Sequence, residues 1–144
     1  MRKVFSFEQN GLLIKELDLN WRKSCLASVL LIDVRSKVLG LFIDCDLETM
    51  ENRIYQSGSF YFEYEKNALA FHHVKGKELA YQFVQNEGIF IGNLMYKIFR
   101  SPILSIEYSM LDVQIGKQDT FNKKDEAIVE ESYCVSNIEL FLIK

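Results

Sequence analysis

Residues 59–74 read SFYFEYEKNALAFHHV, and this stretch decides the fold that we predict for the chain. Two runs rich in aromatic residues flank Lys66 and Asn67, which form a possible two-residue turn. Asn tolerates the left-handed backbone conformation that such a turn needs. The stretch therefore predicts a β-hairpin. Its paired residues are Phe60 with His73, Tyr61 with His72, Phe62 with Phe71, Glu63 with Ala70, Tyr64 with Leu69, and Glu65 with Ala68.

Side chains alternate along a strand, so this pairing gives the hairpin one apolar face and one polar face. A shift of one residue would mix the two kinds of side chain, which favours this register. We expect the aromatic pair Phe62 and Phe71 to lie in the core. The polar face then lies toward solvent. It consists of Tyr61, Glu63, Glu65 and His72, with two alanines between them.

The composition is that of a globular protein. The chain has 144 residues, of which 49% are hydrophobic and 26% charged, and we expect residues 1–144 to form a single domain. It has no run of the ~20 apolar residues that a membrane helix needs, and its first residues do not resemble a signal peptide. Three widely spaced cysteines, Cys25, Cys45 and Cys134, argue against a disulfide framework. They favour reduced thiols, buried as small core residues, and a cytoplasmic location.

The N-terminal third contains a second hairpin signal. Asn10-Gly11 predicts a tight turn between strands at residues 4–9 and 12–17. Residues 18–27 predict a short helix, because Leu17 and Trp21 fall on one stripe. Helix could also run further, since residues 29–32 are apolar throughout and periodicity does not distinguish helix from strand there.

The middle of the chain predicts further strands. Residues 29–34 and 38–45 are apolar almost throughout, which is typical of strands in the centre of a sheet. Gly40 interrupts the second of them, which indicates a bulge or close packing against another element. Another strand is expected to begin near Ile54.

The C-terminal half mixes helix and strand signals. Residues 76–88 fit a helix, although Leu79, Tyr81 and Phe83 also alternate as in a strand, and residues 93–100 fit a second helix. Residues 103–115 predict one long strand with a bulge near Met110, and residues 133–143 predict a closing strand inside the sheet. The predicted class is α+β, with a dominant antiparallel sheet and two or three short helices. An all-β barrel or sandwich is the alternative.

The sequence offers few groups for catalysis or metal binding. The only histidines, His72 and His73, are neighbours on a strand, so they point to opposite faces and cannot readily share a metal. His72 could act as a base beside Glu63, although a solvated sheet face is the simpler interpretation. Asp44 and Asp46 form a pattern that is common by chance and matches no calcium loop. No nucleophile elbow, phosphate loop or zinc motif occurs, so we expect no cofactor and no metal.

The excess negative charge is confined to the last quarter of the chain. The net charge is −3, residues 112–144 hold seven acids and four bases, and the remaining residues hold equal numbers of each. Nothing resembles the basic surface of a nucleic-acid binder, and we expect no membrane partner either. The acidic segment at residues 119–131 and the polar hairpin face are the candidate binding surfaces. The acids proposed for binding in that segment are Asp125, Glu126, Glu130 and Glu131.

The chain has no catalytic motif, and its predicted scaffold is acidic and rich in β-strands. These features favour a protein that binds another protein, and a basic partner would suit the acidic charge. An inhibitor or an immunity protein that neutralises a toxin or nuclease would fit, because charge complementarity speeds association with a basic target. Two alternatives stay open. One is a small-molecule binder with a cavity between the sheet and the helices. The other is a hydrolase-like enzyme that uses His72 with Glu63.

Overall fold

The protein is mostly antiparallel β-sheet with two short helices, as the sequence predicts. The computed structural model describes residues 1–22, 27–44, 52–56, 58–73, 78–93, 102–115 and 131–143. The elements are β1 (Arg2–Ser6), α1 (Phe7–Asn10), α2 (Ile14–Arg22), β2 (Ala27–Val34), β3 (Lys37–Ile43), β4 (Asn52–Gln56), β5 (Phe60–Glu65), β6 (Ala68–His73), β7 (Glu78–Val84), β8 (Gly88–Asn93), β9 (Pro102–Glu107), β10 (Asp112–Ile115) and β11 (Glu131–Ile143).

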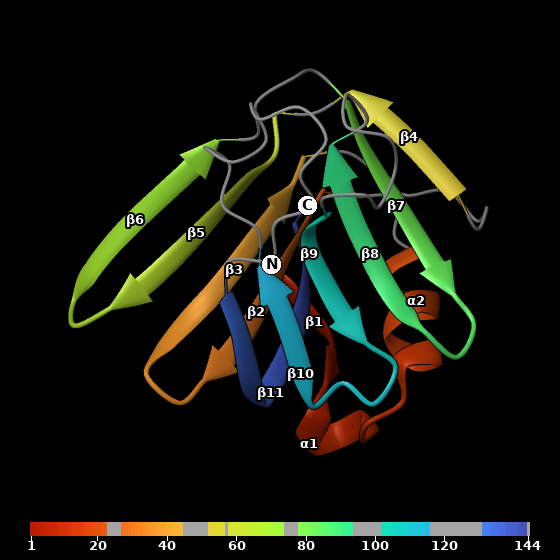
Figure 1. Ribbon diagram of the computed structural model, residues 1–144, viewed down its shortest axis with the longest axis horizontal. Helices are drawn as coiled ribbons and strands as arrows, with labels where there is room; N and C mark the ends of the chain where they lie inside the picture. Colours follow the sequence, from red (N-terminus) through yellow and green to blue (C-terminus); the bar gives the residue numbers. More distant parts are fainter. Residues whose placement is uncertain are drawn as a thin grey trace.

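The strands of the described residues follow the order β4-β7-β8-β9-β10-β11-β2-β3-β5-β6, and β1 also pairs with β11. The long strand β11 joins the two halves, because its first residues pair with β10 and the rest pair with β2. The two halves of the strand order pack face to face (Figure 1). The layers are therefore those of a β-sandwich, which the sequence analysis gave as an alternative, with helices added. The predicted closing strand is confirmed in its position inside the sheet.

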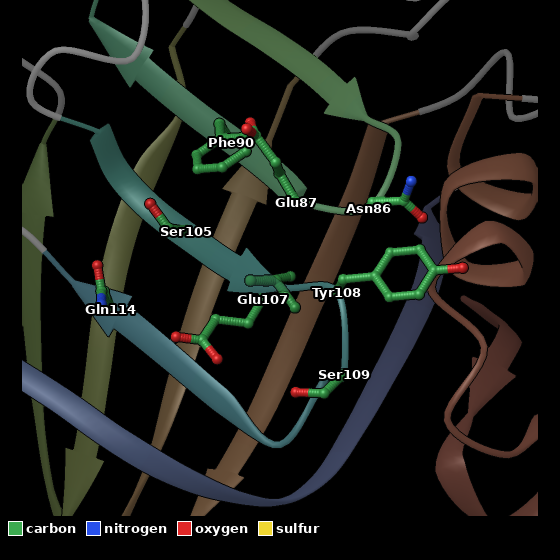
Figure 2. A pocket seen from close by; sticks show the side chains of 9 residues that line it. Asn86, Glu87, Phe90, Ser105, Glu107, Tyr108, Ser109 and Gln114 are labelled. Carbon is green, nitrogen blue, oxygen red and sulfur yellow. The ribbon is translucent and has the colours of Figure 1, made fainter.

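The core lies between these layers. Its side chains alternate along the strands, with Leu30 and Ile32 from β2 and Ile89 and Ile91 from β8 all buried. The alternate residues of β8, β9 and β10 stand on the outer surface, where Figure 2 shows Phe90, Ser105 and Gln114. The predicted strands at residues 29–34 and 38–45 are confirmed as β2 and β3, next to each other in the middle of the strand order.

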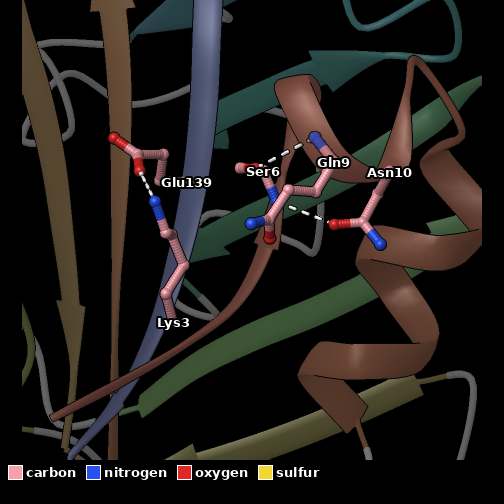
Figure 3. Close-up of polar contacts among 5 residues, drawn as sticks. All are labelled: Lys3, Ser6, Gln9, Asn10 and Glu139. Atoms are coloured by element: carbon pink, nitrogen blue, oxygen red, sulfur yellow. Dashed lines mark hydrogen bonds and ion pairs between the residues drawn. The ribbon is translucent and has the colours of Figure 1, made fainter.

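The hairpin predicted at Asn10-Gly11 is wrong. The side chain of Ser6 instead caps α1 by accepting a hydrogen bond from the Gln9 amide, and the Asn10 side chain accepts one from the Ser6 amide (Figure 3). α2 then begins four residues before the expected helix. Its buried side chains Ile14, Leu17 and Trp21 are spaced as on one helix face.

A buried polar network fixes α2 against the sheet. The Tyr81 hydroxyl donates to the Asp18 carboxylate at 2.7 Å, and the Trp21 indole N–H donates to the Ser28 hydroxyl at 2.8 Å. The rings of Trp21 and Tyr81 also meet edge to face at 5.3 Å. Because these buried polar groups have partners, the helix can cover β7 without an unpaired buried carboxylate.

Two further predictions are wrong in detail. Residues 78–84 form β7 rather than a helix, so the alternation of Leu79, Tyr81 and Phe83 is the correct signal. The long strand predicted at residues 103–115 is two strands, β9 and β10, because the chain turns at Met110, whose φ is 59°. The helix predicted at residues 93–100 lies outside the described residues except for Asn93, which ends β8.

Candidate functional site

The β5–β6 hairpin has the predicted register but the opposite orientation of its faces. All six predicted pairs occur, and Lys66 and Asn67 adopt the left-handed backbone of the turn with φ of 50° and 62°. Phe71, however, is 53% exposed and Tyr61 only 5% exposed. The expectation of a core Phe62–Phe71 pair is therefore wrong. The neighbouring strand β3 explains this, because it turns Leu39 and Leu41 toward the core and Gly40 and Phe42 outward.

The outward face carries a cluster of aromatic rings. Phe42 and Phe60 lie 5.0 Å apart between ring centroids, and Phe71 lies 5.4 Å from Phe60 and 6.2 Å from Phe62. The ring of Phe62 occupies the space over Gly40, where any Cβ would overlap with it. Gly40 therefore marks close packing, which is one of the two predicted alternatives. The cluster continues into three exposed side chains at the end of the sheet, Tyr64, Leu69 and Phe71.

The proposed polar face is partly engaged within the protein. The Glu63 carboxylate accepts hydrogen bonds from the Tyr61 hydroxyl and from the Lys37 ammonium, the latter at 3.2 Å. Tyr61 is buried, so it does not offer the exposed anchor that we expected. Glu65 is exposed next to the turn. The side chain of His72 is not among those described, so its possible role as a base beside Glu63 stays a prediction.

The acidic candidates lie almost wholly outside the described residues. This applies to Asp125, Glu126 and Glu130, while Glu131 begins β11 without a described side chain. The structure therefore does not bring this segment together with the hairpin, and its proposed role stays a prediction.

The remaining candidates lie only partly within the described residues. Asp44 accepts a hydrogen bond from the Gly58 amide at 2.6 Å, so its carboxylate closes a loop beside β5, and Asp46 lies outside the described ranges. Cys134 is a free, exposed thiol rather than a core residue, and the other two cysteines lie outside those ranges. Among the described residues no group of three acidic, histidine or cysteine side chains could hold a metal ion.

The sequence pattern missed the exposure of Leu69 and Phe71, because it assigned their face to the core. Their exposure of 51% and 53% makes them the most prominent apolar side chains of the hairpin. No local signal in the sequence distinguishes them from core residues.

The profile of the TLDc domain matches residues 1–144, the whole of the chain. The chain belongs to the TLDc domain family. A comparison with curated proteins finds no match. No helix in the described part of the chain is both long and apolar enough to cross a membrane.

Proposed function

We propose that this TLDc domain is a protein-binding module and that the β5–β6 hairpin is its docking element. The observation that carries the proposal is the exposure of Tyr64, Leu69 and Phe71, at 44%, 51% and 53%. Tyr64 and Leu69 are direct partners across the hairpin, and Phe71 follows Leu69 on the same face. A contiguous exposed apolar patch of this kind is typical of a protein interaction site.

The edge of β6 supports a particular mode of binding. In the described part of the chain β6 ends the strand order and pairs only with β5, without any register shift. Edge strands that are protected against pairing with another chain carry lysine, proline or a bulge. The β6 sequence ALAFHH contains neither lysine nor proline. An extended segment of a partner protein can therefore add to β6 by backbone hydrogen bonds, with its apolar side chains packed on Leu69 and Phe71.

The aromatic cluster prepares this surface for binding. Phe71 contacts the rings of Phe60 and Phe62, and Phe62 is seated on Gly40. These contacts restrict the rotamers of Phe71 before any partner arrives. Binding then costs less side-chain entropy than ordering a free surface residue, which is about 0.5–1.5 kcal/mol for each immobilised side chain.

The other functions that the sequence allows receive less support. A small-molecule cavity between the layers finds little room beside Leu39 and Leu104, where the enclosed space is about 10 Å³. The Glu63 carboxylate accepts hydrogen bonds from Tyr61 and Lys37, and its use with His72 in a hydrolase-like enzyme stays a prediction. A role as an inhibitor or immunity protein for a basic toxin or nuclease depends on the acidic segment and stays a prediction.

A displayed library of random peptides can test the proposal, because the sequence of each selected peptide can be read. We expect selection on the purified protein to enrich extended peptides with apolar residues at alternate positions. Leu69→Ser with Phe71→Ser should abolish their binding. Leu111→Ser is the matched control, because Leu111 is 48% exposed on the turn between β9 and β10. Equal binding by all three proteins would contradict the proposal, as would dimerisation of the chain through β6, since the occupant would then be a second copy.

A further inference from the structure

A second surface lies on the outer face of β8, β9 and β10, in the half of the sheet that does not contain the hairpin. It is an open groove of about 560 Å³. Figure 2 shows its side chains, which come from these three strands and from the turns that precede β8 and follow β9. Among the described residues, the groove is lined by two carboxylates, Glu87 and Glu107, and by no lysine, arginine or histidine.

Strand register brings the groove residues together. Phe90 on β8 pairs with Ser105 on β9, and Ser105 pairs with Gln114 on β10, so the three side chains form a row across the sheet. Glu107 pairs with Gly88, where any Cβ would overlap with the Ile106 carbonyl oxygen, so β8 and β9 approach closely at this pair. The Tyr108 amide donates to the Glu87 carbonyl at 2.9 Å, which ties the two turns together at the same end of the row.

Ser105 is the most informative residue of the groove. It is only 5% exposed, its side chain projects into the groove, and its hydroxyl has no hydrogen-bond partner among the described residues (Figure 2). The hydroxyl oxygen is not one of the fully buried side-chain atoms that lack a partner, so it is accessible to a ligand in the groove. The two carboxylates likewise form no ion pair within the described part of the chain. As far as the described residues go, the groove therefore presents acceptors and negative charge without a cation.

We propose that this groove binds an arginine side chain on an extended segment of a partner protein. A guanidinium group carries five N–H donors in one plane, which suits two carboxylates, a hydroxyl and the amide oxygen of Gln114. Its planar face can also stack on an aromatic ring such as Phe90. The proposal is independent of the hairpin, which lies in the other half of the strand order.

The charges distinguish this ligand from two others. Free arginine carries an α-carboxylate that Glu87 and Glu107 would repel, whereas an arginine within a peptide does not. A neutral sugar would use the hydroxyl and the amide, but it would leave both negative charges without compensation. Charge complementarity thus favours a basic peptide segment.

Blocked arginine, N-acetyl-arginine methylamide, is the probe for the test. We expect it to shift the backbone amide resonances of residues 86–90, 105–109 and 112–114 in a saturable manner. Blocked citrulline has nearly the same shape without the charge, and it should bind about tenfold more weakly or not at all. Equal shifts with both probes, or no saturable shift with either, would overturn the proposal without any variant of the protein.

Variants then assign the contacts. Glu87→Gln with Glu107→Gln should remove the difference between the two probes, and Ser105→Ala should weaken binding of blocked arginine. Glu8→Gln with Glu16→Gln is the matched control, because it removes the same charge from exposed sites on α1 and α2. Undiminished binding by the groove variants would contradict the proposal. A methyl glucoside that shifts these resonances when blocked arginine does not would identify a sugar site instead.

Discussion

Gly40 and Phe62 are direct partners across β3 and β5, and the ring of Phe62 lies over the Gly40 backbone where a side chain would otherwise stand. This contact decides the shape of the outward face. Because Gly40 has no side chain, the far end of the Phe62 ring can lie over its backbone, and the rings of Phe60 and Phe71 pack beside Phe62. A glycine in a central strand thus supports the exposed end of the hairpin.

Gly40→Ala tests this arrangement. The new methyl group must displace the Phe62 ring, so we expect a loss of about 1–3 kcal/mol in the free energy of unfolding, measured by urea denaturation. In a Phe62→Ala background the same substitution should be neutral or stabilising, since alanine restricts the unfolded chain more than glycine does. Equal costs in both backgrounds would show that the ring contact does not exist.

Tyr81→Phe tests the buried network at α2. It removes the hydroxyl that donates to the buried Asp18 carboxylate, so we expect a loss of about 1–3 kcal/mol in the free energy of unfolding. Tyr64→Phe is the control, because its hydroxyl bonds to Asn67 at an exposed position, and it should cost less than about 0.5 kcal/mol. A similar small effect of both substitutions would contradict the role assigned to Tyr81.

Asp33→Asn tests the electrostatics of the outward face of β2. Burial, and then the charge of Glu139, raises the pKa of the Asp33 carboxyl in the folded protein. A raised folded-state pKa means that the folded protein binds the proton more tightly, so ionised Asp33 lowers stability once the pH exceeds that pKa. We therefore expect Asp33→Asn to stabilise the protein at neutral pH. The gain should disappear below the unfolded-state pKa of Asp33. A gain that is constant across denaturation curves from pH 3 to pH 7 would contradict this.

Cys134 gives a chemical test of the exposed part of β11. Its thiol is free and exposed, so a thiol reagent should modify it rapidly in the folded protein. Cys134→Ser should remove this rapid phase. Denatured, unreduced protein should show all three thiols free, and a missing thiol would contradict the predicted reduced state.

The sequence predicts local pairing better than it predicts burial. The turn at Lys66 and Asn67, together with strand alternation, is sufficient for the register of β5 and β6. Which face of the hairpin is buried depends on the position of the opposite layer. The local sequence of the hairpin carries no information about that layer. Phe71 therefore looked like a core residue, and Tyr61 like a surface residue.

Two errors had different physical causes. The Asn10-Gly11 signal competed with the Ser6 cap and with the helical spacing of Ile14 and Trp21, and these together were stronger. The turn at Met110 was missed for another reason. Residues 108–111 contain no glycine, proline or asparagine, so none of these typical turn residues marks the turn. A change of alternation phase was the only trace of that turn.

The groove could not be predicted from the sequence, because it depends on the pairing of β8 with β9 and of β9 with β10. The sequence instead predicts a helix at residues 93–100 and one continuous strand at residues 103–115, so neither pairing is expected. The same pairing determines which carboxylates share the surface.

Amide hydrogen exchange along β6 tests the docking of a partner strand most directly. With a saturating amount of a library-selected peptide, the account predicts slower exchange at alternate amides of residues 68–73, because an added strand bonds to every second residue of its neighbour. The amides of residues 88–93 should exchange at an unchanged rate. Protection that appears elsewhere, while β6 exchanges as it does in the free protein, would contradict the proposed function.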